Sequence, residues 1–134
     1  LRTLLDQLGT EPVTVVGDGP AGVVALCAAA LDERIAHTVT VGSLASYISD
    51  VPYTNQRLGL MAPNMLREVG DITHLATLIA PRRLTIAGAV NGSGKALTSA
   101  ELKASFKFTG RFFKGGSFSV LPNGDAQAIL RILK

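Results

Sequence analysis

The sequence predicts an α/β protein with three αβα layers, in which a mostly parallel sheet of about four strands lies between helices. Short apolar strands alternate with helices along the chain, an order that favours a parallel sheet. A chain of 134 residues that is 47% hydrophobic and 17% charged can bury one core but not two, so residues 1–134 form a single domain. Residues 13–22 join a β-branched strand, a glycine turn and an alanine-rich helix, the kind of junction that carries sites in α/β proteins.

The N-terminal half supplies two strands. Residues 13–16 form an apolar strand without polar alternation, which predicts a central strand covered on both faces. Pro20 is expected as the first residue of a helix that ends at Leu31, and residues 38–41 form the second strand. A helix that Gly9 ends is predicted before these elements by the spacing of Leu1, Leu4, Leu5 and Leu8.

The C-terminal half repeats the alternation. Residues 43–70 are mostly loop with a short helix at 64–68, and Asp71 is the N-cap of a helix that ends near residue 79. A capping box, Thr98 to Glu101, begins another helix that ends near residue 109. The remaining predicted elements are strands at 83–87 and 117–121, a flexible loop at 91–94 and a last helix at 125–134.

Composition excludes several functional classes. The net charge is +3 and the basic residues look scattered, without a stripe of interleaved aromatics, so nucleic acid is not expected as a partner. The longest apolar run, residues 23–31, is too short to cross a bilayer, and no membrane partner is expected. Cys27 is the sole cysteine and is expected to be buried and inert, which leaves no intrachain disulfide. The start at Leu1 is consistent with a processed or excised piece, so the compartment stays open.

Two interpretations compete for the turn of Gly17, Asp18, Gly19, Pro20, Ala21 and Gly22. In the first, Gly17, Gly19 and Gly22 form a dinucleotide-binding fingerprint, which makes the chain a nucleotide- or FAD-binding oxidoreductase fragment. That fingerprint needs an acidic residue after the second strand to bind ribose hydroxyls, and none occurs between Glu33 and Asp50. The carboxylate of Asp18 would also lie unfavourably close to the phosphates.

In the second interpretation, the turn is a nucleophile elbow of the pattern G-x-S-x-G, with Gly19 at the serine position. Residues 28–35 (AAALDERI) and 75–84 (LATLIAPRRL) resemble the corresponding segments of acetyl-xylan-esterase and dienelactone-hydrolase-like enzymes of the α/β-hydrolase superfamily. The resemblance covers roughly residues 1–121 and implies the second half of that fold, with four of about eight strands.

The resemblance also implies where a catalytic triad would lie. The nucleophile position holds Gly19, the acid position Asn91, and the histidine position Gly124 or Asp125. The first oxyanion-hole donor would be the backbone N–H of Pro20, which proline lacks. We therefore expect a catalytically inactive esterase-like module, a pseudoenzyme with a structural, binding or interaction role. A weak carboxylesterase is the remaining alternative.

Other polar residues are expected to have ordinary roles. His37, before a strand, and His74, in the first turn of a helix, are predicted to be surface or edge residues and form no metal-ligand pattern. Asp32 to Arg34 are expected at a solvated helix end, Arg82 and Arg83 at a strand entrance, and Ser93 in a flexible surface loop. No cofactor is expected. Half a fold leaves an unpaired sheet edge near the elbow strand, so the expected partner is a missing N-terminal half or another copy of the chain.

Overall fold

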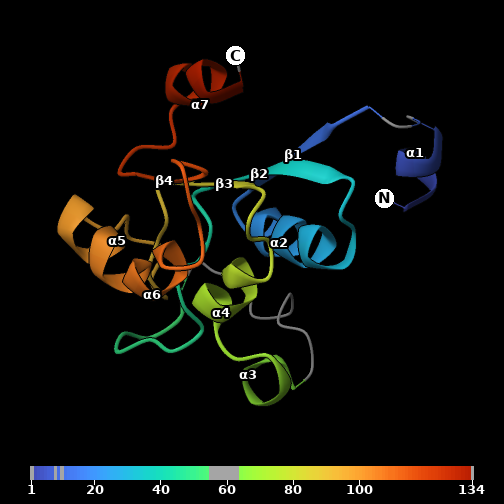
Figure 1. Cartoon of the computed structure of the whole chain (residues 1–134). Coiled ribbons are helices and arrows are strands. Elements are labelled where there is room, and N and C mark those ends of the chain that lie inside the picture. Colours follow the sequence, from blue (N-terminus) through green and yellow to red (C-terminus); the bar gives the residue numbers. More distant parts are fainter. Residues whose placement is uncertain (1, 8, 10, 55–63, 134) are drawn as a thin grey trace.

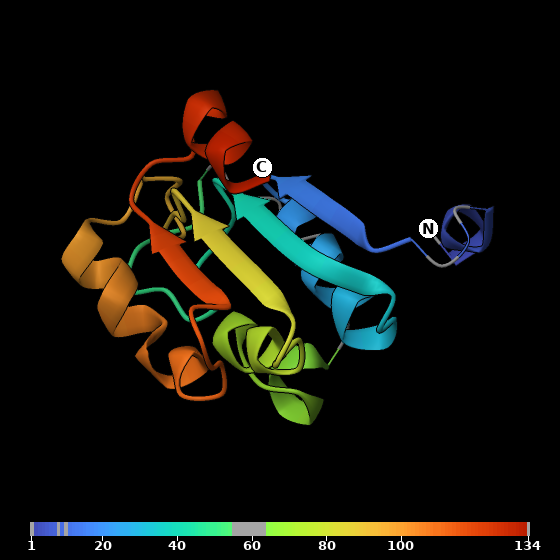
Figure 2. The same ribbon diagram turned by 45° about the horizontal axis from the view of Figure 1, so that its top comes forward.

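The computed structural model of the protein contains one sheet of four parallel strands, and their order in the sheet is their order in the chain. The structure describes residues 2–7, 9, 11–54 and 64–133. Figure 2 shows the strands side by side. They are β1 (Val13–Asp18), β2 (Ile35–Val41), β3 (Arg83–Ala87) and β4 (Phe118–Leu121).

Most helices lie on one side of this sheet. Because each crossover between parallel strands is right-handed and moves in the same direction across the sheet, successive connecting helices fall on the same face. Figure 1 shows this face covered by α2 (Ala21–Leu31), α4 (Ile72–Thr77) and α6 (Lys107–Gly110), with α5 (Ser99–Ser105) beside β4 and α3 (Met65–Glu68) below α4. The opposite face carries α7 (Ala126–Leu133), while α1 (Arg2–Gln7) lies beyond β1. The three predicted layers are present, but they are unequal.

The hydrophobic core lies between the sheet and α2, α4 and α5. Strand pairing places Thr38 beside Leu84 and Thr40 beside Ile86, so these side chains share the face toward α2. The residues that fill this space are fully or almost fully buried: Val23, Leu26, Leu75, Ile79, Leu84, Ile86, Leu102 and Phe106. The main core therefore lies on this side of the sheet, although Val39 and Ala87 on the opposite face are also fully buried.

The prediction of a central strand at residues 13–16 was wrong, whereas the unpaired edge that was expected near this strand is present in the described sheet. β1 pairs with β2 alone in the described sheet, and Thr14, Val16 and Asp18 on its face toward α7 are exposed. Val13 and Val15, which alternate with them, pack against the core. An apolar, β-branched run is compatible with an edge strand that has one buried face and also with a central strand that has two. The sequence of the run does not distinguish them, because the number of neighbouring strands depends on the tertiary structure.

Capping residues define the helices much as predicted. Asp71 caps α4 and Thr98 forms the predicted capping box with Glu101, although the helix it begins divides at Phe106 into α5 and α6. Pro20 is the N-cap of α2 and not its first helical residue. A helix occurs near the chain start, but Leu1 and Leu8 lie outside the described residues, as do residues 55–63 of the long loop.

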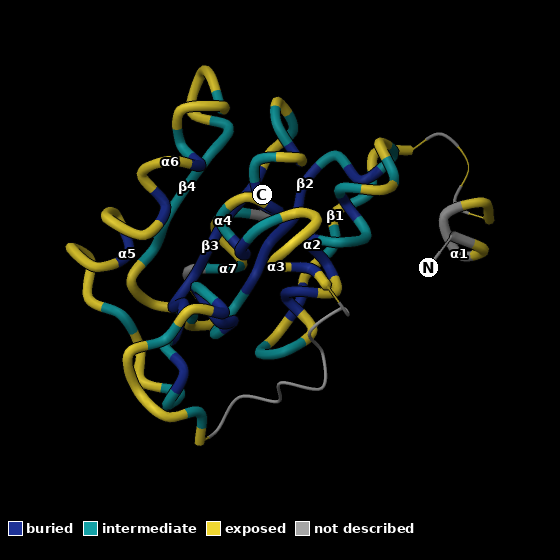
Figure 3. The backbone as a smooth tube through the Cα atoms, turned by 90° about the horizontal axis from the view of Figure 1, so that it is seen from below, coloured by how far each residue is buried: buried dark blue, intermediate teal, exposed yellow. Residues whose placement is uncertain are grey.

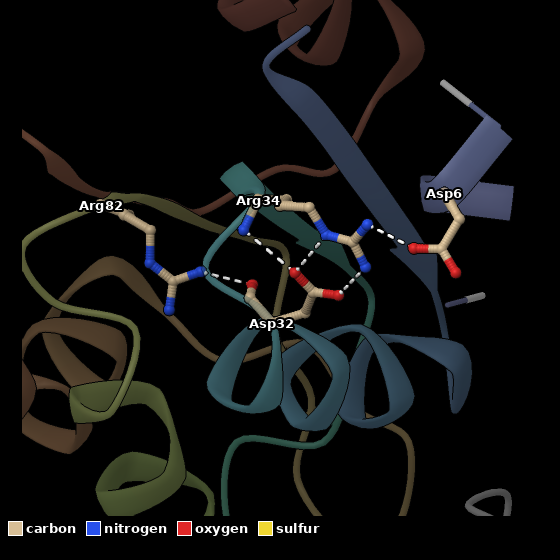
Figure 4. Close-up of polar contacts among 4 residues, drawn as sticks. All are labelled: Asp6, Asp32, Arg34 and Arg82. Atoms are coloured by element: carbon tan, nitrogen blue, oxygen red, sulfur yellow. Dashed lines mark hydrogen bonds and ion pairs between the residues drawn. The ribbon is translucent and has the colours of Figure 1, made fainter. Parts of the chain in front are cut away.

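Arg82 and Arg34 form hydrogen bonds with the carboxyl end of α2. Arg82 donates to the carbonyl oxygens of Ala29 at 2.7 Å and of Asp32 and Ile35 at 2.9 Å, so the guanidinium binds groups that the helix end leaves unpaired. Arg34 forms ion pairs at 2.6 Å with Asp32 and with Asp6 of α1 (Figure 4). The predicted solvated helix end is thus an organised junction.

Candidate functional site

The turn between β1 and α2 has the shape of a nucleophile elbow. Gly19 has φ of +53°, in the left-handed region, and Pro20 follows at φ −60° and leads directly into α2. The Gly19 N–H donates to Val41 O at 2.7 Å, and Gly22 N–H donates to Gly19 O at 3.1 Å. The chain therefore reverses from strand to helix within two residues, as in the sharp turn that presents a nucleophile in α/β-hydrolases.

Gly17 and Gly22 lack space for a side chain, whereas Gly19 does not. A Cβ on Gly17 would lie 2.5 Å from Ala21 O, and one on Gly22 would lie 1.7 Å from Ser43 Oγ, so both allow α2 to approach the sheet closely. A Cβ on Gly19 would meet nothing within 4 Å. The nucleophile position therefore has open space but no side chain to fill it.

Ser43 is the residue that fixes this turn, and sequence reasoning missed it. Its hydroxyl donates to Gly19 O at 2.6 Å while its own carbonyl accepts from Val90 N at 2.9 Å. Ser43 is buried, directly after β2, where a dinucleotide site would hold a carboxylate. Its position after the second strand could have indicated a residue near the glycine turn, but the sequence does not show that the Ser43 hydroxyl bonds to Gly19.

Asn91, at the acid position, closes its own loop. Its side-chain oxygen accepts from Ser93 N at 3.0 Å, Ser93 Oγ at 2.8 Å and Lys95 N at 3.0 Å. Its backbone N–H donates to Lys95 O at 2.9 Å. The Asn91 side chain is therefore a loop cap, and Ser93 lies half-buried in a hydrogen-bonded turn where a flexible surface segment was predicted.

The histidine position packs against the ends of β2 and β3. The Gly124 N lies 2.9 Å from where a Cβ on Gly88 would stand, and a Cβ on Gly124 would lie 2.8 Å from Val41 Cγ1. The following residue, Asp125, is exposed and its carbonyl accepts from Ile129 N at 3.1 Å. Because Val41 O also accepts from Gly19 N, Gly19 and Gly124 both lie against the end of β2.

Both histidines are engaged elsewhere. His37 lies inside β2, is buried, and its Nε2 is 3.1 Å from Thr85 Oγ1, so the prediction of a surface or edge residue was wrong. Burial, and then the charge of Arg83, lower the pKa of His37. His74 is exposed as predicted, and its Nδ1 accepts from Asp71 N at 3.1 Å.

Asp71 does more than cap α4. Its carboxylate is 9% exposed and accepts from Tyr47 N at 2.7 Å and Ile72 N at 2.8 Å, and its second oxygen accepts from the Ser46 hydroxyl. One carboxylate thus ties the loop after β2 to the start of α4. The N-cap pattern predicts the bond from Asp71 to the start of α4, but its bonds to Ser46 and Tyr47 can be seen only in the tertiary structure.

A cavity of about 370 Å³ lies between that loop, the Asn91 loop and α5. Two of its lining residues, Asp50 and Glu101, are acidic, and none of the twelve is basic. Hydrogen bonds from the Thr98 backbone and hydroxyl lower the pKa of Glu101, so this carboxylate is ionised at neutral pH. The cavity therefore disfavours anionic ligands.

Cofactor chemistry gains no support from this geometry. Among the described residues, no three His, Cys, Asp or Glu side chains are grouped to hold a metal ion. Cys27 is half-buried on α2, less buried than predicted, and burial raises its pKa, which disfavours the reactive thiolate. A dinucleotide fold binds where the strand order reverses, and the order β1-β2-β3-β4 contains no such reversal within the described sheet.

Comparison with known proteins supports the fold assignment. No family model matches the chain, and the search of curated proteins gave no match. Among solved structures, the chain is similar to a carbohydrate esterase family 15 glucuronoyl esterase from Caldicellulosiruptor kristjansonii, with a TM-score of 0.56 and 19% identity. The match covers 98% of this chain and 46% of that esterase. The chain thus has an α/β fold resembling an esterase of the α/β-hydrolase type and spans less than half the length of that protein.

Proposed function

We propose that this chain is an α/β-hydrolase-type module that does not catalyse ester hydrolysis at its glycine turn. The observation that carries this proposal is the pair Gly19–Pro20 at the tip of the elbow. Gly19 supplies no nucleophile, and Pro20 supplies no backbone N–H to stabilise an oxyanion.

The positions that would complete a triad support the same conclusion. Asn91 uses its side-chain oxygen to close a loop, and a side chain at Gly124 would need Val41 to move, since a Cβ there would lie 2.8 Å from Val41 Cγ1. Loss of a nucleophile or a base alone costs several orders of magnitude in rate. Restoring a serine would therefore not restore catalysis.

An ester-hydrolysis assay tests this proposal. The purified chain and Gly19→Ser should both hydrolyse p-nitrophenyl acetate at the rate of buffer alone, and thermal melts should show whether the variant is folded. Turnover that one substitution abolishes, for example Ser43→Ala or Ser46→Ala, would refute the proposal and favour the weak-carboxylesterase alternative. Saturable thermal stabilisation by NAD or FAD would instead favour the nucleotide-binding alternative.

The structural role that we propose is pairing through β1. On the face toward α7, burial decreases from Val39 and Ala87, which are fully buried, to Val16 at 46% exposure. The outer edge of β1 has no neighbouring strand among the described residues. Since unpaired parallel edges are normally covered, a strand from the rest of an esterase-like fold or from another copy of the chain pairs there.

Light scattering after size exclusion tests the pairing. The chain by itself should associate, and Val16→Lys should weaken that association, since a charge would be buried in the contact. Val24→Lys is the matched control, because Val24 is 53% exposed on α2, and α2 covers the other face of the sheet from Val16. A monomer at all concentrations would rule out the second copy as the partner.

A further inference from the structure

The positive charge of the protein is concentrated in one segment. Residues 103–114 contain four of the 13 basic residues and none of the 10 acidic ones. The remaining chain therefore carries nine basic and ten acidic residues, close to neutrality. The expectation of scattered basic residues therefore overlooked a cluster that is local in the sequence and that falls on α5, α6 and the turn after them.

These residues are exposed along α5, α6 and the turn that follows them. Lys103 lies in α5, Lys107 begins α6 after the break at Phe106, and Arg111 is the C-cap of α6. The residues between them that point inward, Leu102, Phe106 and Thr109, are buried. Figure 3 shows the exposed stretches of α5 and α6 on the outer margin of the molecule. We define the basic-aromatic face as the exposed side chains of Lys103, Lys107, Phe108, Arg111, Phe112 and Lys114.

Two aromatic rings lie among these charges. Phe108 and Phe112 are 41% and 49% exposed, and their ring centroids are 5.1 Å apart in an edge-on arrangement. His74 of α4 packs on Phe108 at 5.2 Å, which continues the aromatic row onto the next helix. The neighbouring Phe106 is buried in the core, whereas Phe108 and Phe112 remain exposed beside lysines. Exposed apolar side chains next to positive charges indicate a partner with both apolar and anionic groups.

An anionic lipid surface fits these features better than other partners. Lysine, which makes up three of the four charges, is depleted in protein–protein interfaces but typical of surfaces that bind acidic headgroups. Exposed phenylalanines enter the boundary between headgroups and acyl chains. The helices α5 and α6 lie at the margin of the molecule, beyond β4, where their exposed side chains are accessible to a large partner (Figure 1).

We propose that the basic-aromatic face binds the surface of membranes that contain anionic lipids. The expectation of no membrane partner rested on the absence of a spanning segment, and among the described residues no helix is long and apolar enough to span a bilayer. A peripheral contact needs no such helix. This proposal is independent of the chemistry at the glycine turn.

Co-sedimentation with vesicles tests the proposal. The chain should bind vesicles of equimolar phosphatidylcholine and phosphatidylserine and not vesicles of phosphatidylcholine alone. Binding should fall as NaCl rises from about 0.1 M to about 1 M, because the Debye length shrinks from about 10 Å to about 3 Å. Lys107→Glu with Arg111→Glu should lower the partition coefficient at least tenfold, since each basic charge contributes about fivefold.

Matched variants distinguish binding through the basic-aromatic face from effects of net charge and of exposed apolar side chains in general. Lys95→Glu with Arg131→Glu makes the same change in net charge at exposed positions elsewhere and should preserve binding. Phe108→Ser with Phe112→Ser should weaken binding severalfold while its salt dependence remains, whereas Val24→Ser with Leu31→Ser should not. Thermal melts of every variant verify folding.

Three results would overturn the assignment. One is equal binding to both kinds of vesicle, and another is an equal loss in the Lys95 and Arg131 control. The third is binding to heparin, polyglutamate or single-stranded DNA that matches vesicle binding and does not depend on Phe108 and Phe112. That result would assign the face to a soluble polyanion.

Discussion

At the scale of single residues, the close approach of α2 to the sheet depends on one pair, Gly22 and Ser43. Ser43 Oγ fills the space that a Gly22 side chain would need and uses it to hold Gly19 O. The buried hydroxyl is satisfied there, so it adds order to the turn without leaving an unpaired polar group. The shape of the turn between β1 and α2 therefore rests on this contact between Ser43 and Gly19.

Gly22→Ala should destabilise the protein. The new Cβ would lie 1.7 Å from Ser43 Oγ and 3.1 Å from Thr40 Cβ, and overpacking of this kind costs about 1–3 kcal/mol. In a Ser43→Ala background the added cost should be smaller but not zero, because Ser43 Cβ still lies 2.7 Å away. Urea denaturation of the unmodified chain, both single variants and the double variant measures the coupling free energy between Gly22 and Ser43. Additive effects would show that Ser43 does not limit the space at Gly22.

His37 should make stability depend on pH. Burial and Arg83 hold its pKa below the ordinary 6.5, so the unfolded chain takes up a proton more readily than the folded chain. The free energy of unfolding should therefore be highest above that value and fall as the pH drops from about 7 to about 5. His37→Gln should flatten this part of the profile, and chemical denaturation across this pH range measures the slope for each protein. Equal slopes in the unmodified chain and in His37→Gln would contradict the assignment.

At the scale of elements, α2 is fixed at both ends by groups from outside the helix. Its start follows from Pro20 and the bond from Gly19 to Val41, and its end is held by the guanidinium of Arg82, far along the chain. This arginine binds three carbonyl oxygens at 2.7–2.9 Å, one within α2, one at its C-cap Asp32 and one on Ile35, the first residue of β2. It thereby sets where α2 ends and where β2 begins.

Arg82→Ala should lower the free energy of unfolding by about 3 kcal/mol, since it leaves half-buried carbonyls without a charged donor. Arg82→Lys should have an intermediate effect, because an ammonium group cannot span three acceptors as the planar guanidinium does. Arg67→Ala is the control, since Arg67 makes an exposed ion pair with Glu68, and it should change stability by less than about 1 kcal/mol. Chemical denaturation compares the three variants, and equal effects of Arg82→Ala and Arg67→Ala would show that the cap contributes little.

At the scale of the whole molecule, the two faces of the sheet are covered unequally. The face toward α2 is packed by helices from three crossovers, whereas α7 lies over the other face and its Ile129 and Ile132 are half-buried. Coverage is weakest at β1, where the sheet also has its free edge. The fold is thus compatible with further strands or a second copy at that edge.

Hydrogen exchange should detect this asymmetry. In dilute solution the amides of β2 and β3 should exchange slowly, because each of these strands has two neighbours, and part of β1 should exchange fast. At high concentration β1 should become protected if another copy pairs with it. Mass spectrometry on peptides covering residues 11–20 measures the change. Protection of β1 that is complete at every dilution would mean that its edge is not free.

The sequence by itself determined the α/β class, the alternation of strands and helices, and the capped helices that start after Asp71 and Thr98, since periodicity and capping are local properties. It also located the glycine turn and the lack of a nucleophile and of an N–H at Gly19 and Pro20, because residue identity alone decides both.

Only the tertiary structure decided between a central and an edge position for β1, and only it showed that His37 is buried and that Ser43 fills the space beside Gly22. The physical reason is common to all three. Each depends on contacts between segments distant in sequence, and the order of strands and the packing of helices, which local patterns do not encode, bring those segments together.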